Sequence, residues 1–382
     1  MIKNIIISKS ARDDKVTSKI VNFYSEAKVQ LIEQDRIEGR IVEGDPKNNL
    51  FLTHSKGDVI RACPGTSGQY LCCRYQIINQ TLNCPFNCTY CILQYYLNQS
   101  ATIIYTDFNK ILNNLDKALF EYGNRFIRIG TGELGDSLAL FGSRLFAKEA
   151  VEFFASKNNI LFELKSKSNQ IEPLLDLKPN KRTVVSWSLN PPEIILQEEL
   201  GTNSLDERLD AAKSLENQGY LLGFHFDPVI KVKNWQKRYG DLIEKLYTKI
   251  NPDNIAWISI GSLRFPPSTK DQIIKHYPHT RIIYEEMIKG LDGKMRYPRP
   301  LRAQIYKFIY KKLKDIYNPP FIYFCMENKT VWQEVMGFSP DNNAYLDWMF
   351  ADSIYKRFKG IVSQKPNIQN FENALNIDGS EF

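Results

Sequence analysis

From residue 76 onward, short apolar runs alternate with longer amphipathic runs, and this alternation limits the possible folds more than any other feature. The short runs are rich in β-branched and aromatic residues, which is typical of buried strands, and the longer runs carry apolar residues at helical spacing. Strands that alternate with helices form βαβ units and a parallel sheet. The many repeats therefore predict an α/β fold built as a full or partial (β/α) barrel.

The pattern also predicts the individual elements, with Ser204 as a plausible N-cap. The expected strands are residues 75–80, 125–133, 160–168, 181–190, 220–230, 255–264 and 320–328. The expected helices are residues 108–123, 139–157, 204–219, 235–250 and 298–316. The expected units are an N-terminal cap domain at 1–75, the barrel at 76–340, and a C-terminal extension at 341–382 with a partly disordered tail from about 364.

Polar side chains gather at the ends of the expected strands. In (β/α) barrels the chemistry takes place at the carboxyl ends of the strands. The candidate positions are Cys84 to Cys91, Thr131 to Glu133, Lys165, Lys167, Ser188, Asn190, His225, Asp227, Ser262, Arg264, Cys325 and Glu327.

Composition and charge narrow the class of protein. The chain has 382 residues, of which 43% are hydrophobic and 24% charged, and its net charge of +7 permits a nucleic-acid partner without requiring one. No apolar run reaches about 18 residues, so no membrane span is expected. Because no signal peptide is recognisable either, a cytoplasmic location is expected. Six of the seven cysteines lie within residues 63–91, a clustering that favours metal or redox chemistry over a disulfide framework.

Cys84, Cys88 and Cys91 form a C-x3-C-x2-C motif in "LNCPFNCTYCILQ". The candidates are a zinc site, a [4Fe–4S] cluster with four cysteine ligands, a cluster with three protein ligands and one open iron, and three free core cysteines. No fourth cysteine continues the spacing of these three. The spacing therefore favours the three-ligand cluster, whose open iron can bind a small molecule.

This motif, with Tyr90 before its last cysteine, resembles the radical SAM superfamily. The resemblance implies that the open iron binds S-adenosylmethionine (SAM), which is reductively cleaved to a 5′-deoxyadenosyl radical. A second match supports it, because Gly130, Thr131, Gly132 and Glu133 resemble the family's glycine-and-glutamate motif for the SAM amino group. Glycines allow a ligand to approach the backbone closely, and a carboxylate complements an ammonium.

Further blocks resemble the spore photoproduct lyase group over roughly residues 60 to 335. They include "SKSNQIEPLL", "SWSLNPPEI", "GTNSLDERLDAAKSLENQGYLLGF" and "SLRFPPSTKDQIIKHYP". The resemblance implies a partial (β/α)6 barrel with a small N-terminal domain, SAM contacts from Lys167 and Ser188, and a reductase partner such as flavodoxin or ferredoxin. It implies a DNA-repair lyase that acts on pyrimidine photoproducts.

A DNA substrate requires basic groups for its phosphates and extrusion of the lesion from the base stack. The strongest basic stretch in the chain is "KGLDGKMRYPRPLR". A solvated surface loop is the alternative interpretation of such a stretch. Its cations are Lys289, Lys294, Arg296, Arg299 and Arg302.

The chain departs from the lyase pattern at two positions. The lyases have a hydrogen-donor cysteine near the position of Gly130, and a tyrosine at the position of Ile92. Cys325 is the candidate replacement donor, and His225 with Asp227, on one face of a strand, are candidates for orienting substrate or moving a proton. Tyr90 is the fourth candidate catalytic residue.

Three hypotheses follow from these residues. The first is the DNA-repair lyase, and the second is a radical SAM enzyme of the same group with a different substrate, which the missing cysteine favours. The third is a nucleic-acid-binding protein with a structural cluster, which the open iron argues against. Cys63, Cys72 and Cys73 lack a second-cluster spacing and are expected to be structural or channel thiols.

Overall fold

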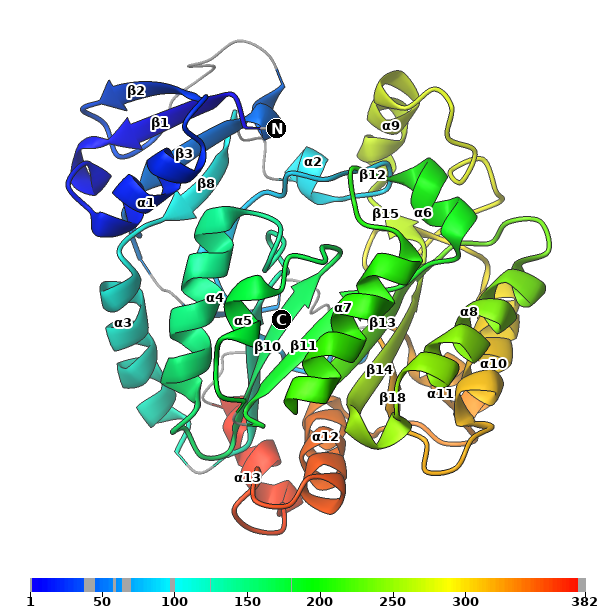
Figure 1. Ribbon diagram of the computed structural model, residues 1–382. Coiled ribbons are helices and arrows are strands. Elements are labelled where there is room, and N and C mark those ends of the chain that lie inside the picture. The colour runs from blue at the N-terminus through cyan, green and yellow to red at the C-terminus, as the bar shows by residue number, and fades with distance from the viewer. Residues whose placement is uncertain are drawn as a thin grey trace.

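The computed structural model describes residues 2–37, 45–57, 60–63, 70–96, 100–123, 125–179 and 181–376. Its larger sheet has the order β18-β14-β13-β11-β10-β9-β5-β4 and curls into a partial barrel (Figure 1). In the described residues seven of these strands are parallel and only β4 is antiparallel. The strands are β4 (Ile60–Ala62), β5 (Gln76–Ile78), β9 (Ile127–Thr131), β10 (Ile160–Ser166), β11 (Thr183–Ser188), β13 (Leu221–Val229), β14 (Ile255–Ser262) and β18 (Phe321–Phe324).

The α/β partial barrel is confirmed, with one more parallel strand than the six that the resemblance implied, because β18 joins the sheet beside β14. Helices cover the outer face of this sheet (Figure 1). Ser204 caps α7 through a capping box with Glu207, as the sequence predicted. The covering helices are α3 (Phe108–Glu121), α4 (Phe141–Phe154), α5 (Glu172–Leu175), α7 (Leu205–Gln218), α8 (Trp235–Lys249) and α10 (Arg299–Lys314).

Residues alternate between the two faces of each barrel strand. On β10, Phe162 stacks on Phe154 of α4 with ring centroids 4.6 Å apart, so it points outward to the helices. Glu163 instead contacts His225 of β13, which lies two strands away, and this contact places both side chains in the barrel interior. The interior is therefore polar, whereas the outer face supplies the hydrophobic core.

A second, smaller sheet lies beside the barrel and has the order β2-β1-β3-β8-β6. Helix α1 (Lys15–Phe23) packs on it through Ile20. A boundary at residue 75 does not separate the two sheets, because β4 precedes it and joins the barrel, while β6 and β8 follow it and complete the small sheet. The strands are β1 (Asn4–Ser8), β2 (Lys28–Ile32), β3 (Asn49–Thr53), β6 (Thr81–Leu82) and β8 (Thr102–Tyr105).

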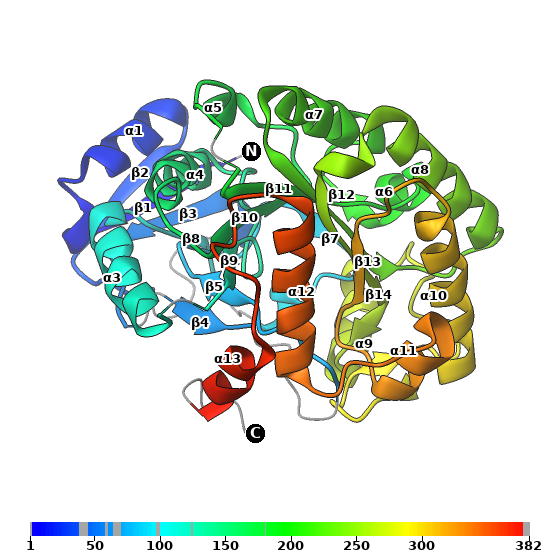
Figure 2. The same cartoon turned by 90° about the horizontal axis from the view of Figure 1, so that it is seen from below.

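The C-terminal extension covers the amino ends of the barrel strands. Figure 2 shows α12 (Asn343–Arg357) lying across the opening of the curved sheet, and Phe350 packs on Phe321 with ring centroids 4.6 Å apart. Part of the tail is helical: α13 (Ile368–Glu372) buries Phe371, and Arg74 donates to the carbonyl of Phe371. Residues 377–382 lie outside the described residues. None of the described helices has the length and apolar character needed to cross a membrane.

Candidate functional site

The three cysteines of the motif lie on one loop above the carboxyl ends of the barrel strands. Cys84 follows β6, Cys88 ends β7 (Asn87–Cys88), and Cys91 precedes α2 (Leu93–Tyr96). Strand β7 pairs antiparallel with β12 (Glu199–Leu200), which places Cys88 opposite Glu199. The loop is therefore held to the barrel at its middle.

The thiols of this loop suit a shared metal cluster. Burial raises the pKa of Cys88 to about 12 and that of Cys84 well above its usual value, and the Cys91 thiol adds to both shifts, so Cys91 lies within electrostatic range of the other two thiols. No three His, Cys, Asp or Glu side chains in the described ranges converge on a single-ion geometry. A cluster of several irons is larger than one ion, so its ligands stand farther apart.

The glycine-and-glutamate loop adjoins the cysteine loop. The Asn83 N–H donates to the carbonyl of Leu134 at 2.7 Å, which joins the two loops directly. Gly132 has a φ of +97°, and a Cβ there would lie 2.7 Å from the Lys165 carbonyl oxygen. Only glycine suits this position, so the backbone of the loop lies directly against β10.

Asp136, which the sequence reasoning missed, fixes this loop to the end of β10. Its carboxylate accepts the Lys167 N–H at 2.8 Å and the Ser166 hydroxyl at 2.7 Å. Glu133 forms an ion pair with Lys165. Although burial lowers it, the carboxylates of Glu133 and Glu163 raise the pKa of Lys165, which keeps this ammonium charged. The loop therefore presents a carboxylate beside a fixed positive charge.

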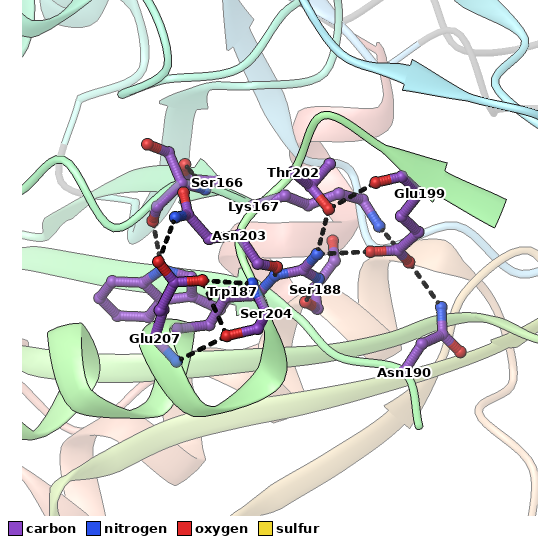
Figure 3. Close-up of polar contacts among 12 residues, drawn as sticks. Ser166, Lys167, Trp187, Ser188, Asn190, Glu199, Thr202, Asn203, Ser204 and Glu207 are labelled. Atoms are coloured by element: carbon purple, nitrogen blue, oxygen red, sulfur yellow. Dashed lines mark hydrogen bonds and ion pairs between the residues drawn. The ribbon is translucent and has the colours of Figure 1, made fainter. Parts of the chain in front are cut away.

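Lys167 lies next to the cysteine loop, where it contacts Tyr90 and Glu199. Its Nζ is 2.9 Å from the Tyr90 hydroxyl and 2.7 Å from Glu199 Oε1. Figure 3 shows Lys167 and Asn190 pointing toward Glu199 from different elements, and Asn190 donates to Oε1 at 2.8 Å. Two predicted site residues, Tyr90 and Lys167, are thus brought together by a carboxylate that no motif had marked.

Arg208 supports the same carboxylate from the opposite side. Its guanidinium donates to Glu199 Oε2 at 2.7 Å and to the Ser188 carbonyl at 2.8 Å, and it is fully buried. Ser188 thus contributes a backbone contact at the end of β11. Glu199 and Arg208 do not form a motif with a recognisable spacing, and Lys167 and Tyr90, the other partners of Glu199, are distant in sequence.

His225 belongs to a polar layer in the barrel interior. Its Nε2 lies 2.9 Å from Glu163 Oε1, and its Nδ1 lies 2.7 Å from Ser259 Oγ. Ser186 and Trp257 also donate to Glu163 Oε1, at 2.7 Å and 3.2 Å. Burial opposes ionisation, but His225 and Lys165 lower the pKa of Glu163 to about 2, so a carboxylate is fixed at the centre of the barrel.

Asp227 and Cys325 meet one layer higher, at the mouth of the barrel. Arg264 donates to both Asp227 oxygens at 2.9 Å and 3.0 Å, and its Nη2 lies 3.5 Å from Cys325 Sγ. Burial and the Asp227 carboxylate raise the pKa of Cys325, so its thiol stays protonated. His225 and Asp227 share a strand face, as predicted, but each bonds a different set of partners.

Gly130 cannot accept any side chain. A Cβ at this position would collide with the Glu163 carbonyl oxygen and the Tyr75 hydroxyl. The Tyr75 ring is buried beside Arg128, and burial raises its pKa well above the usual value. A cysteine here would therefore require both the neighbouring strand and Tyr75 to move. Ile92, at the other departure from the lyase pattern, is 36% exposed.

Two of the five predicted DNA-binding cations are structural. Arg296 is 1% exposed and pairs with Asp292 at 2.5 Å, and Arg302 is 3% exposed and forms two hydrogen bonds to Glu327. Their positive charge is used inside the protein and is not offered to a phosphate. Lys289, Lys294 and Arg299 lie nearer the surface, where Lys294 contacts Asp292 and Arg299 contacts Glu334.

The remaining cysteines have different neighbours: Cys72 contacts the start of α12, whereas Cys63 and Cys73 lie nearer Cys325. Cys72 donates its N–H to Asn343 at 2.8 Å, and the Cys73 carbonyl accepts from Arg128. The Cys63 and Cys73 thiols both contribute to the raised pKa of Cys325, after burial and Asp227, so they lie within electrostatic range of it. Their prediction as structural or channel thiols stays a prediction.

Comparisons with known proteins identify the same family over most of the chain. The family model described as spore photoproduct lyase matches residues 72–324. The spore photoproduct lyase of Clostridium acetobutylicum is 25% identical over 341 residues, covering 83% of this chain and 97% of that protein. The enzyme of Bacillus subtilis is 30% identical over 232 residues, covering 60% of this chain and 66% of that protein.

A solved structure supports the fold independently. A spore photoproduct lyase complexed with dinucleoside spore photoproduct superimposes with a TM-score of 0.75 at 20% identity, covering 85% of this chain and 99% of that chain. The region matched by the family model contains the cysteine loop, the glycine-and-glutamate loop and Lys167. The chain therefore belongs to the spore photoproduct lyase family.

Proposed function

We propose that this protein is a radical SAM enzyme that repairs pyrimidine photoproducts in DNA, with Cys84, Cys88 and Cys91 as ligands of a [4Fe–4S] cluster. The observation that carries the proposal is the meeting of three parts at the barrel mouth: the cysteine loop, the glycine-and-glutamate loop and Lys167. The family relatives are named as lyases of this lesion, and one solved relative contains bound AdoMet with dinucleoside spore photoproduct. The cluster, when bound, supplies the electron for reductive cleavage of SAM.

The chain's own charges suit the two ends of the SAM amino-acid group. Glu133 and the backbone around Gly132 form an acceptor edge for an ammonium. Lys167 and Arg208 carry two positive charges, and Glu199 neutralises one of them. One positive charge therefore remains on this side of the site for the carboxylate of SAM. Ser188 lies on the same side, at the end of β11.

Return of hydrogen to the repaired base requires a donor, and we assign that role to Cys325. Its S–H bond would break as a C–H bond forms on the substrate radical, which leaves a sulfur radical on the protein. One electron and one proton from a reductase of the flavodoxin or ferredoxin class would restore the thiol. Asp227 and Arg264 would orient the substrate at the barrel mouth, and His225 would support them from the polar layer below.

A second candidate function is a related radical SAM reaction on a different substrate. The closure of Gly130 to any side chain favours it, because the donor position of the lyases is absent here. Both candidates require SAM cleavage, and they differ only in the molecule that loses hydrogen.

The test begins with anaerobic reconstitution, which should give about four irons per chain. Dithionite and SAM should then release 5′-deoxyadenosine, measured by chromatography and mass spectrometry. Oligonucleotide carrying deuterium-labelled spore photoproduct should transfer label into 5′-deoxyadenosine and release repaired thymines. No SAM cleavage would contradict both candidates. Cleavage without label transfer or repair would leave only the second.

A further inference from the structure

Two consecutive acidic residues, Glu198 and Glu199, are buried beside the cysteine loop, and we call them the acidic pair. Glu198 is 4% exposed and Glu199 is 1% exposed. Glu198 ends α6 (Pro192–Glu198) and Glu199 begins β12, whose backbone pairs with β7. Their carboxylates reach different partners, because Glu198 ends a helix whereas Glu199 begins a strand.

Glu198 is bonded through neutral groups. Its Oε2 accepts the hydroxyl of Thr89, which lies between two of the cysteines, and the hydroxyl of Thr280 at 2.7 Å. The Thr89 N–H also donates to the Glu198 carbonyl at 2.8 Å. A neutral amide oxygen would accept these hydroxyls equally well. Glu198 therefore holds the loop without needing its charge.

Glu199 is bonded through two cations. Lys167 lies 2.7 Å from Oε1 and Arg208 lies 2.7 Å from Oε2, while Tyr90, the neighbour of Thr89 in the loop, donates to Oε1 at 2.5 Å. Burial raises its pKa, but Lys167 and Arg208 outweigh that effect and hold the pKa of Glu199 far below its usual range. An amide could not serve both cations, because its NH2 group would face one of their N–H donors.

We infer that Glu199 is a positioning residue that fixes Lys167 and Tyr90 for SAM, whereas Glu198 holds the same loop without contributing to SAM affinity. Arg208 is fully buried and bound to the carbonyls of Ser188 and Asn203, so it anchors Glu199 rigidly. Because Glu199 is held in place, it also holds Lys167, whose long side chain loses conformational entropy when it is immobilised. The inference rests on the proposed role of Lys167 in binding SAM.

The charges support this division of roles. Arg208 is enclosed on all sides, while the side chain of Lys167 is 16% exposed. The surplus positive charge of the group is therefore accessible to a ligand only at Lys167. Glu199 keeps that ammonium beside the cysteine loop instead of letting it extend toward solvent.

The test compares Glu199→Gln with its matched neighbour Glu198→Gln. Equilibrium binding of SAM to the reconstituted proteins is measured together with their iron content. Glu199→Gln should weaken SAM binding by about tenfold or more, since charge-assisted hydrogen bonds are lost, while Glu198→Gln should stay within about twofold. Iron content should match the wild type in both variants, because the cysteines and the β7–β12 pairing remain. Equal SAM affinity in wild type and Glu199→Gln, or equal losses in both variants, would overturn the inference.

A double-mutant cycle separates positioning from general structure. In a Lys167→Met background, Glu199→Gln should cause no further loss of SAM affinity if it acts through Lys167, and an additional loss of the same size would contradict the inference. Should Glu199→Gln fail to fold, Glu199→Asp keeps the charge on a shorter stem and should still weaken SAM binding; unchanged affinity in it would also count against the inference. A wild type that binds no SAM would instead defeat the proposed function.

Discussion

Gly130 illustrates at the scale of one residue how tertiary packing excludes the cysteine that the resemblance to the lyases would lead one to expect there. The sequence shows the missing cysteine but gives no reason for it. The reason is the Tyr75 hydroxyl and the Glu163 carbonyl, which together fill the space that a Cβ would need. Glu163 lies in β10 and Tyr75 directly precedes β5, so only the assembled barrel reveals the restriction.

Replacement of Gly130 by alanine should destabilise the fold. Because one of the clashing atoms belongs to the backbone of β10, the strain cannot be relieved by a rotamer change, and a loss of about 1–3 kcal/mol is expected. Urea-induced unfolding measures it. Gly240→Ala in α8 is the control, because the nearest atom would lie 3.9 Å away and helix propensity should add about 0.5–1 kcal/mol of stability. A Gly130→Ala variant as stable as the wild type would refute the packing argument.

The thiol of Cys325 gives a second prediction at this scale. Cys325→Ser keeps a polar atom near Arg264, but its O–H bond is too strong to give up a hydrogen atom to carbon. Repaired thymines should therefore fall by at least about tenfold in Cys325→Ser and Cys325→Ala, while SAM cleavage continues. The measurement is the ratio of repaired DNA to 5′-deoxyadenosine. A normal ratio in the serine variant would exclude Cys325 as the donor.

At the scale of elements, α12 completes the barrel from below. Phe350 packs on Tyr323 of β18 and lies under the guanidinium of Arg128, whose Cζ is 3.3 Å from the ring centroid. The same helix carries Asp347, which is 4% exposed and lies 3.9 Å from Arg128. The sequence marked this region only as an extension, because its partners lie on strands far away in the chain.

The ionisation of Asp347 should make stability depend on pH. Burial raises the pKa of Asp347 to about 7, although Arg128 lowers it in part. A folded pKa above the unfolded value stabilises the protein below about pH 4, and that contribution is lost as the pH rises to about 7. Above pH 7, Asp347→Asn should therefore be more stable than the wild type by a few kcal/mol. This difference follows from the raised pKa, because each pKa unit corresponds to roughly 1.36 kcal/mol.

The measurement for Asp347 is the free energy of unfolding in urea from pH 4 to pH 8. The difference between Asp347→Asn and wild type should grow with pH over this range. A constant difference would show that Asp347 has an ordinary pKa in the folded protein.

At the scale of the whole molecule, the basic stretch divides into structural and exposed charges. Arg302 and Glu327 form a buried pair, whereas Lys289 lies on the surface in β16 (Ile288–Lys289). The five cations of the stretch therefore overstate the charge that it offers to DNA, because Arg296 and Arg302 are neutralised by buried carboxylates. Sequence alone could not separate the two kinds of cation, because burial decides the difference and Glu327, the partner of Arg302, lies in another segment.

The two kinds of cation should respond differently to substitution. Arg302→Gln leaves Glu327 as an uncompensated buried charge and should cost about 3–5 kcal/mol of stability. Lys289→Gln should leave stability unchanged and weaken DNA binding by a similar factor for all sequences, with a smaller slope against salt concentration. Fluorescence anisotropy with labelled duplexes at several salt concentrations measures the binding. An unchanged salt slope in Lys289→Gln would place Lys289 away from the DNA.

The sequence by itself determined the chemistry and the class of fold. The spacing of Cys84, Cys88 and Cys91, the glycines before Glu133 and the regular alternation of strands and helices are local patterns, and local patterns can be recognised without coordinates. The tertiary structure alone decided which charges act together. Glu199 with Lys167, Arg302 with Glu327, and Tyr75 above Gly130 are contacts between segments distant in the chain, and such contacts exist only after the sheet has curled.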